Sequence, residues 1–345
     1  MRILVTGHKG YIGTLLIPML MAQGHEVVGL DSGLFEQCFF QRPVPEIPSL
    51  RKDIRDVQSS DLDGFDAVVH LAGLSNDPLG SLNPDVTYEI NHLATVRLAR
   101  LAKEMGTQRF LFSSTCSIYG AAGEDMVSEE SQAHPVTPYG HSKTLAEKDV
   151  GALADSNFSP TFLRSATAYG VSPCLRLDLV LNNLVAWAFT TGQVYLKSDG
   201  TAWRPVVHVE DIARVFIAVL HAPRDAVHGQ IFNVGRSEEN YRIRDLAELV
   251  EETVPGSHVE YARDAGTDKR SYRVDCGKLA RTLPEFKPRW NARRGARQLY
   301  EACRTASLTL DDFEGPRYRR VRHIEQLLHT GRLDATMRRR ERELG

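Results

Sequence analysis

Short apolar runs alternate with longer segments of helical spacing, and this alternation restricts the fold of the chain more than any other feature. The runs Ile3 to Val5, Val27 to Leu30, Ala67 to Leu71 and Phe110 to Phe112 have the length of buried strands. The pattern continues through Pro160 to Ala166. Parallel strands that are joined by helices form a sheet with helices on both faces. The sequence therefore predicts an α/β fold.

A less regular region begins after about residue 170. Glycine and proline interrupt it at Gly192 to Pro205, whereas Leu177 to Thr191 has helical spacing. We expect the chain to return to the first domain through buried strands at Val206 to Val209 and Gln230 to Val234. These boundaries predict a first domain at 1–170 with returning segments at about 206–235, a smaller lobe at 171–205 and 236–310, and a tail at 311–345.

The tail is rich in arginine and has helical propensity. It contains Arg317, Arg319, Arg320, Arg322, Arg338, Arg339, Arg340 and Arg342. Such a run is typical of a solvated, fraying chain end. We therefore predict a charged tail in solvent, with a contact to another subunit or to an anionic ligand as the alternative.

Composition excludes several classes of protein. The formal net charge is -2, so the chain has no electrostatic footprint for nucleic acid. Its five cysteines lie far apart without metal-ligand spacing, which argues against a zinc site and against a disulfide framework. No apolar run approaches the roughly 18 residues that span a bilayer, and the N-terminus has no signal-peptide pattern. We expect a cytoplasmic protein without a metal or a membrane partner.

Three glycines follow the first predicted strand at equal spacing. Residues 6–13 read TGHKGYIG, which places Gly7, Gly10 and Gly13 in the turn that opens the first helix. Glycine there permits a tight turn and lets the backbone approach a pyrophosphate, which the helix N-terminus stabilises. The second strand ends at Asp31, whose carboxylate can bind an adenosine ribose and repels a 2′-phosphate. Because no arginine stands next to Asp31 in the sequence, NAD is favoured over NADP.

With these motifs the chain resembles the extended short-chain dehydrogenase/reductase superfamily over roughly residues 1–310. Within it, the motifs are most similar to those of the NAD-dependent nucleotide-sugar epimerase/dehydratase family, in particular the UDP-sugar 4-epimerases. The resemblance implies a Rossmann-type, doubly wound parallel sheet with a smaller C-terminal α/β lobe that binds the substrate. Besides the glycines and Asp31, it implies NAD contacts from Tyr11, Ile12, Asp53, Ile54, Leu71, Ala72, Asn91 and Ser113.

Tyr139 and Lys143, in the segment PYGHSK, are the candidates for a catalytic pair. A spacing of four on a helix places both side chains on one face. Because a tyrosine with a pKa of about 10 is a poor base at neutral pH, we expect the lysine ammonium to lower the pKa of the tyrosine. By resemblance, Lys143 also holds the nicotinamide ribose and stands with Tyr139 among the cofactor contacts. Thr115, at the end of the strand FLFSST, bridges the substrate oxygen and the tyrosine.

Positions 116 and 117 distinguish members of this family. Where 4,6-dehydratases have Asp-Glu and decarboxylases have a Glu, this chain has Cys116 and Ser117. Water elimination and the decarboxylase arrangement therefore lack their usual acid/base group. We interpret Cys116 as a small packed side chain, with proton transfer as the alternative.

The resemblance also implies residues that hold the diphosphate of a substrate. Asn183 lies in an Asn-Asn-Leu segment like that of UDP-sugar 4-epimerases, and Arg204 matches an arginine that pairs with a phosphate. Arg263 and Asp268 fall near an arginine and an aspartate that bind phosphate and ribose, within a register of one or two residues.

Five further residues are candidates for the sugar end. Arg176 and Asp178 either form an ion pair at the hinge between the lobes or reach the sugar. Asn76 and Asp77 lie in the loop of residues 74–83 that borders the sugar in the family, and they either read hydroxyls or belong to a polar turn. Thr167 stands where 4-epimerases usually have Asn.

Together these residues predict an NAD-dependent epimerase that acts on a nucleotide-diphosphate sugar at C4 through a transient 4-keto sugar. The alternatives are a 4-ketosugar reductase or dehydrogenase, an atypical dehydratase, and a non-catalytic regulator that senses a dinucleotide. We also expect a homodimer through two helices. One is Pro84 to Met105, whose apolar residues form a single stripe that lies on the sheet or on a partner, and the other is Tyr139 to Ala154.

Overall fold

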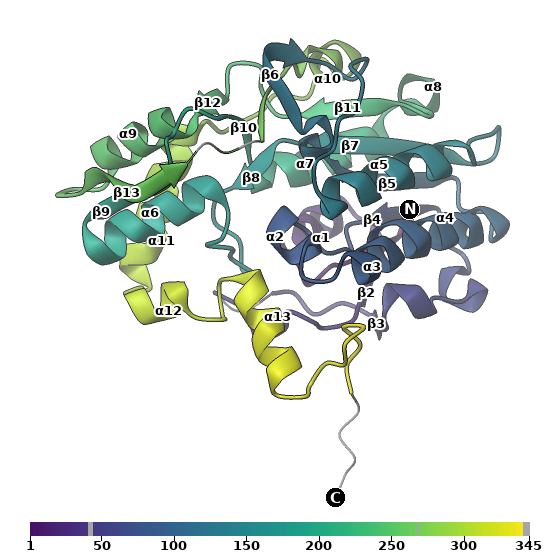
Figure 1. Ribbon diagram of the computed structural model, residues 1–345. Coiled ribbons are helices and arrows are strands. Elements are labelled where there is room, and N and C mark those ends of the chain that lie inside the picture. Colours follow the sequence, from purple (N-terminus) through teal and green to yellow (C-terminus); the bar gives the residue numbers. More distant parts are fainter. Residues whose placement is uncertain (41–43, 267, 269, 341–345) are drawn as a thin grey trace, which may run out of the picture.

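The computed structural model describes residues 1–40, 44–266, 268 and 270–340. Its main element is a sheet of seven strands at the right of Figure 1. From edge to edge the strands are β11 (Ile231–Val234), β7 (Ser159–Ser165), β5 (Arg109–Thr115), β4 (Ala67–His70), β1 (Arg2–Thr6), β2 (Glu26–Asp31) and β3 (Ser49–Arg51). All neighbouring pairs are parallel. The predicted α/β fold is confirmed.

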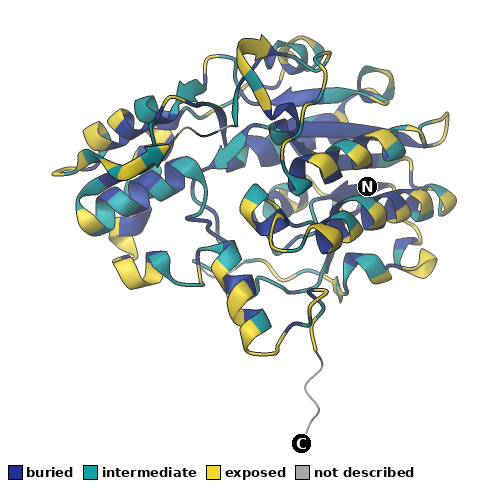
Figure 2. Cartoon of the chain, viewed as in Figure 1, coloured by how far each residue is buried: buried dark blue, intermediate teal, exposed yellow. Residues whose placement is uncertain are grey.

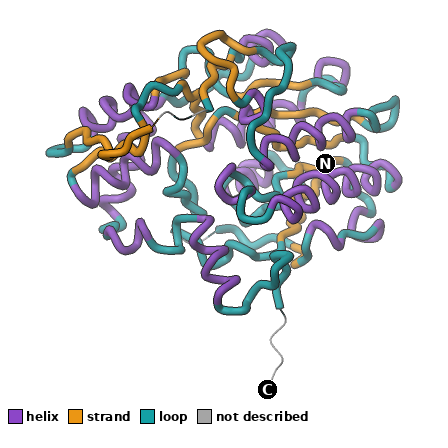
Figure 3. Tube along the Cα trace, in the orientation of Figure 1, coloured by secondary structure: helices purple, strands orange, loops and turns teal. Residues whose placement is uncertain are grey.

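Helices cover both faces of this sheet (Figure 3). Successive side chains of a strand point to opposite faces, so Ile3 and Val5 pack into one apolar cluster and Leu4 into another. The first cluster includes residues of α1 (Gly13–Ala22) and α7 (Val209–His221). The second includes residues of α4 (Ala94–Glu104) and α5 (Pro138–Gly151). The sheet is therefore doubly wound, as the Rossmann-type expectation requires.

The predicted helix from Pro84 to Met105 consists of three consecutive pieces. These are α3 (Pro84–Tyr88), a π-helical turn (Glu89–Leu93) and α4. Most of the stripe is buried against the sheet, but Leu93 is 57% exposed. A π turn contains one residue more than an α turn, and this extra residue shifts the direction in which Leu93 points.

A second lobe lies at the left of Figure 1. It contains a three-stranded sheet and two strand pairs, and three helices pack on one another beside them. The strands are β8 (Thr167–Tyr169), β10 (Trp203–His208) and β12 (Asn240–Arg242), then β9 (Gln193–Ser198) with β13 (His258–Gly266), and β6 (Ala121–Val127) with β14 (Ser271–Val274). The helices are α6 (Val180–Thr191), α9 (Ile243–Thr253) and α11 (Ala292–Thr305). The short helices α2 (Asp77–Gly80), α8 (Arg224–Val227) and α10 (Gly277–Thr282) instead contact α5, β7 and β11 of the first domain.

The two strands that we expected to return to the first domain have different places. β11 forms the edge of the seven-stranded sheet beside β7. β10 instead pairs with β8 and β12 in the separate three-stranded sheet. The helix between them, α7, does return, because its apolar face packs against α1.

The basic tail is folded, and the prediction of a solvated chain end is wrong. It contains α12 (Leu310–Glu314), which lies below the second lobe at the lower left of Figure 1, and α13 (Arg320–His329), which lies at the bottom of the figure. Ile324 and Leu333 are buried in the same cluster as α4 and α5, and Figure 2 shows the inner side of α13 as buried. The arginine pattern concealed these apolar residues. Arg342 lies outside the described residues.

The described residues contain neither a membrane-spanning helix nor a cluster of metal ligands. None of the helices has both the length and the hydropathy of a bilayer-spanning segment. No three His, Cys, Asp or Glu side chains in the described part of the chain gather where they could hold a metal ion.

Candidate active site

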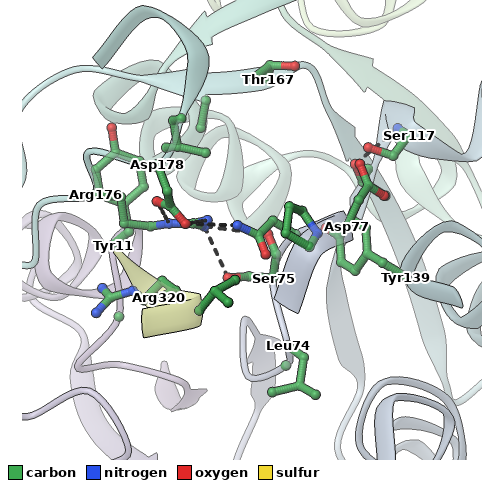
Figure 4. Close-up of a pocket in the computed structure, with 18 of the residues that line it drawn as sticks. Tyr11, Leu74, Ser75, Asp77, Ser117, Tyr139, Thr167, Arg176, Asp178 and Arg320 are labelled. Carbon is green, nitrogen blue, oxygen red and sulfur yellow. Dashed lines mark hydrogen bonds and ion pairs between the residues drawn. The ribbon is translucent and has the colours of Figure 1, made fainter. Parts of the chain in front are cut away.

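A cleft of about 1120 Å³ opens between the large sheet and the second lobe. It runs along the carboxyl ends of β1, β4 and β5, and Figure 4 shows side chains from both lobes around it. The order of the strands reverses between β1 and β4. Ligands of open α/β sheets bind at such a switch point, so this cleft is the candidate site.

The glycine loop forms one end of the cleft, and its shape requires glycine. Gly7 has a φ of +72°, and a Cβ there would lie 2.7 Å from the backbone nitrogen of Ala72. A Cβ on Gly13 would lie 2.6 Å from the carbonyl oxygen of Gly7. Gly10, Tyr11 and the other loop residues line the cleft. The loop therefore has the close backbone packing of a pyrophosphate cradle, which fits a dinucleotide.

We expect Gly7→Ala to remove most of the NAD that co-purifies with the protein. A residue with a Cβ in this backbone conformation costs about 1–2 kcal/mol, and the contact with Ala72 must in addition displace the loop. NAD per chain is measured after release by denaturation. The matched control is Gly24→Ala, because Gly24 has a similar φ of +76° but open space around its Cβ position. Equal NAD content in the two variants would contradict a cradle that depends on close packing.

Asp31 lies at the end of β2, where the dinucleotide's adenosine ribose is expected. Its carboxylate accepts hydrogen bonds from the backbone nitrogens of Lys9 and Gly33, at 3.1 and 2.8 Å. Two arginines that are distant in the sequence lie nearby: Arg51 is the neighbour of Asp31 on β3, and Arg339 donates to the carbonyl oxygen of Gly33. Both pair with Glu36, at 3.0 Å. Because Glu36 neutralises both guanidinium groups, they are poorly placed to bind a 2′-phosphate. This arrangement favours NAD over NADP.

Most of the other predicted cofactor residues line the cleft, namely Ile12, Asp53, Ile54, Leu71, Ala72 and Ser113. The carboxylate of Asp53 caps the turn that follows it and forms a fork with Arg55. Asn91 is an exception, since it is fully buried and does not line the cleft. Its amide bonds to the backbone nitrogen and oxygen of Leu74 and thus holds the loop that borders the site.

Tyr139 and Lys143 lie one turn apart at the start of α5, as predicted. Thr137 caps this helix by accepting a hydrogen bond from Gly140. Lys143 Nζ donates to the carbonyl oxygen of Ser113 at 2.9 Å. The Thr115 hydroxyl, at the end of β5, lies close enough to the Tyr139 phenol to affect its pKa. The structure thus brings all three predicted catalytic side chains to one place in the cleft.

The pKa values of Tyr139 and Lys143 differ from those expected from the sequence. Burial raises the pKa of Tyr139 well above its usual value, and the carboxylate of Asp77 raises it further. The nearby hydroxyl of Thr115 and the charge of Arg176 oppose this shift without cancelling it. Burial lowers the pKa of Lys143 to about 7. The lowered tyrosine pKa that we expected from the lysine is therefore not found, because burial is the largest influence and the nearby charge that opposes it is that of Arg176.

Cys116 belongs to the core and does not line the cleft. It is fully buried, its Sγ donates to the carbonyl oxygen of Arg164 at 3.1 Å, and burial raises its pKa. Ser117 does line the cleft, and so does Asp77, close enough to affect Tyr139 electrostatically. The sequence comparison at positions 116 and 117 missed this carboxylate, because it comes from the loop after β4.

A chain of charged groups crosses the cleft near the residues that we expected to hold the diphosphate of the substrate. Arg204 Nη2 donates to Asp268 at 2.7 Å, Arg270 forms a fork with the same carboxylate, and Arg270 Nη1 donates to Asp77 at 2.9 Å. These bonds connect the second lobe to the loop after β4. Arg270 was missed in the sequence, although it stands two residues after Asp268. Arg263 is exposed on β13 and does not line the cleft. Its match with the phosphate-binding arginine of the family was therefore incorrect.

The sugar end contains an ion pair. Arg176 and Asp178 form a two-bond fork at 3.0 Å, which was one of the two interpretations of these residues. Arg176 also donates to Ser75, and Asn76 donates to Asp178 at 2.8 Å while it caps α2. The group is visible in Figure 4. Two further predicted residues, Thr167 and Asn183, line the cleft as well.

Known proteins with similar sequences and structures catalyse several related reactions. The profile of the NAD dependent epimerase/dehydratase family matches residues 3–235. A UDP-glucose 4-epimerase of Bacillus subtilis (strain 168) is 26% identical over 329 residues, which cover 87% of this chain and 94% of that protein. UDP-glucuronic acid decarboxylase 1 of Arabidopsis thaliana is 25% identical, over 91% of this chain and 72% of that protein.

A solved structure shows the same architecture. TunA, an NAD dependent-NDP-hexosamine 5,6-dehydratase involved in tunicamycin biosynthesis, superimposes with a TM-score of 0.80 at 25% sequence identity. The match covers 90% of this chain and 99% of TunA. Epimerases, decarboxylases and dehydratases of nucleotide sugars are thus all among its relatives. The chain belongs to the NAD-dependent epimerase/dehydratase family, and its cofactor is NAD.

Proposed function

We propose that the protein is a nucleotide-diphosphate-sugar epimerase that inverts C4 through a transient 4-keto sugar. The observation that supports this most is the meeting of Thr115, Tyr139 and Lys143 at one cleft, without a carboxylate at positions 116 and 117. A UDP-glucose 4-epimerase among the relatives spans nearly the whole chain and favours the same reaction.

Each of the three side chains has a separate task. Tyr139 accepts the proton of the sugar's O4 while the hydrogen on C4 leaves with its electron pair, and it returns the proton when the pair comes back to the other face. Thr115 lies beside the phenol and aligns it with O4. Lys143, which lies one helical turn after Tyr139 and donates to the carbonyl oxygen of Ser113, is placed to hold the nicotinamide ribose of NAD. NAD, when bound, supplies the acceptor and later the donor of the hydride.

A dehydratase is the second candidate, and Asp77 is the observation that favours it. This carboxylate lies near Tyr139 and could act as the acid or base that water elimination needs. However, its two oxygens are engaged by Thr137 and Arg270, at 2.6 and 2.9 Å. An engaged carboxylate that holds two lobes together is poorly placed to transfer protons, so we favour the epimerase.

The test is an incubation of the NAD-loaded protein with UDP-, dTDP-, GDP-, ADP- and CDP-hexoses that carry deuterium at C4. We expect one of them to yield its C4 epimer with unchanged mass and with the deuterium still on C4, because the hydride returns to the carbon it left. Nuclear magnetic resonance identifies the epimer, and mass spectrometry follows the label.

The other outcomes separate the alternatives. Loss of the mass of water identifies a dehydratase. Accumulation of reduced, deuterated cofactor together with an oxidised sugar identifies a dehydrogenase. Conversion of none of these sugars by NAD-loaded protein would contradict the proposal.

A further inference from the structure

The C-terminal segment of residues 317–339 packs along the dinucleotide end of the cleft. On one side it is bonded to the loop after β2, where Arg317 donates to the carbonyl oxygen of Phe39 and His323 bonds that of Leu34. On the other side Arg55 donates to the carbonyl oxygen of Thr336 at 2.9 Å. The segment therefore extends from the loop beside Asp31 to the turn that contains Asp53.

This segment contributes directly to the wall of the cleft. Its lining residues are Arg319, Arg320, Val321, Arg322, Glu325 and Met337. Apolar contacts fix the wall in place, since Ile324 and Leu327 are buried in the core cluster of the large sheet. The segment is thus part of the cavity that we assign to the dinucleotide, although the family profile ends at residue 235.

The wall brings positive charge that is only partly balanced by carboxylates. Arg319 pairs with Glu314 at 3.2 Å. Arg320 and Arg322, in contrast, form no direct ion pair with any carboxylate of the described residues, even though both line the cleft. Arg320 is only 2% exposed, its Nη1 has no hydrogen-bond partner among those residues, and the carboxylate of Asp178 acts on it without bonding it. A buried cation without a bonded counterion is costly, which indicates that an anion completes the site.

The position of Arg320 indicates which anion. Its guanidinium stacks on Phe35, 4.1 Å from the ring centroid, and its Nη2 lies 2.9 Å from Cys174 Sγ. Cys174 belongs to the loop in which Ser172 donates to the carbonyl oxygen of Tyr11, at 2.7 Å. Arg320 is therefore next to the glycine loop, and Figure 4 shows it beside Tyr11. The glycine loop is the cradle of the pyrophosphate.

We propose that α13 is a wall of the cofactor site and that Arg320 and Arg322 attract the diphosphate of the dinucleotide. The two charges match the two negative charges of a diphosphate in number, and both arginines line the cleft that the glycine loop also lines. Arg320, held between Phe35 and Cys174, provides the stronger interaction because it is desolvated, whereas the exposed Arg322 is screened by water. The inference depends on dinucleotide binding and is independent of the reaction at C4.

The test compares ADP with adenosine as competitors of labelled NAD on the full-length protein. Both contain the adenosine part, but only ADP contains the diphosphate. We expect Arg320→Gln to lower the affinity for ADP by about tenfold or more, as for the loss of a hydrogen bond to a charged group. The affinity for adenosine should not change. Arg322→Gln should weaken ADP by about threefold. Arg320→Lys keeps the charge and should retain most of the affinity for ADP.

The matched control is Arg332→Gln, because Arg332 is an exposed arginine of the same segment that does not line the cleft. It should change neither affinity. If Arg320→Gln weakens ADP and adenosine by the same factor, Arg320 only supports the wall and the proposal is wrong. Unchanged ADP affinity in Arg320→Gln would also overturn it.

Hydrogen exchange gives a second readout that does not depend on a variant. ADP should slow amide exchange in α13 of the full-length protein and leave α11, in the second lobe, unaffected. Equal exchange of α13 with and without ADP would show that the segment is no part of the cofactor site. A protein that fails the epimerase assay can pass both tests, so the two proposals fail separately.

Discussion

Tyr139→Phe should lower kcat by about 10³-fold, within the range of general acid/base catalysis, and leave the bound NAD in place. We assign the proton exchange with O4 to the phenol of Tyr139 rather than to the hydroxyl of Thr115, and the ring of Tyr139 stays in place when its oxygen is removed. The ring is buried at the start of α5. We therefore expect turnover to be lost without loss of folding, measured by C4 inversion and by NAD released per chain.

Tyr241→Phe is the matched control for this variant. Tyr241 also has a bonded hydroxyl, which donates to Glu239 at 3.2 Å, but it lies on β12 outside the cleft. Its kcat should stay within about twofold of the wild type, since the change is remote from the site. Should Tyr139→Phe retain more than a tenth of the turnover, the proton must pass through another group, and Asp77 would be the first to examine.

The parts of the site that depend on short spacings could be predicted from the sequence. Gly7, Gly10 and Gly13 stand in one turn, so their spacing alone defines the loop. Tyr139 and Lys143 are one helical turn apart, and the cap at Thr137 fixes where that turn begins. In both cases the local backbone determines the geometry, and the structure agrees with the prediction.

The groups that modify this chemistry come from distant parts of the chain. Arg270 and Asp77 are separated by 193 positions and meet across the cleft. Glu36 neutralises Arg51 and Arg339, one of which comes from the last described turn of the chain. Such contacts depend on how the lobes pack, which no spacing in the sequence expresses.

The prediction for the arginine-rich tail failed for a different reason. Counting charges indicated a solvated segment, because only two of the four buried residues of α13, Ile324 and Leu327, are apolar. A stripe this short does not stand out against the charged residues around it. Tertiary packing on the large sheet determines its place, and this packing is what makes its arginines part of the cleft.

Glu147→Ala should lower the free energy of unfolding by about 3–5 kcal/mol, the cost of breaking a buried ion pair. Glu147 and Arg164 are 6% and 7% exposed and form a fork behind the end of β5, with the shortest bond at 2.7 Å. Glu147 also accepts a hydrogen bond from Ser114, which precedes Thr115. Without the carboxylate, the Arg164 guanidinium remains buried and unneutralised. Chemical denaturation measures the loss.

Two further variants decide whether burial is the cause. Glu252 forms an ion pair with Arg293 at the same 2.7 Å, but both side chains are at least half exposed, so Glu252→Ala should cost less than about 1 kcal/mol. The double variant Glu147→Leu and Arg164→Met removes both charges and should recover much of the stability. Equal losses in Glu147→Ala and Glu252→Ala would mean that water reaches the inner pair. In that case Glu147 could not fix β5 under Thr115, and the alignment of Thr115 with Tyr139 would depend on α5 alone.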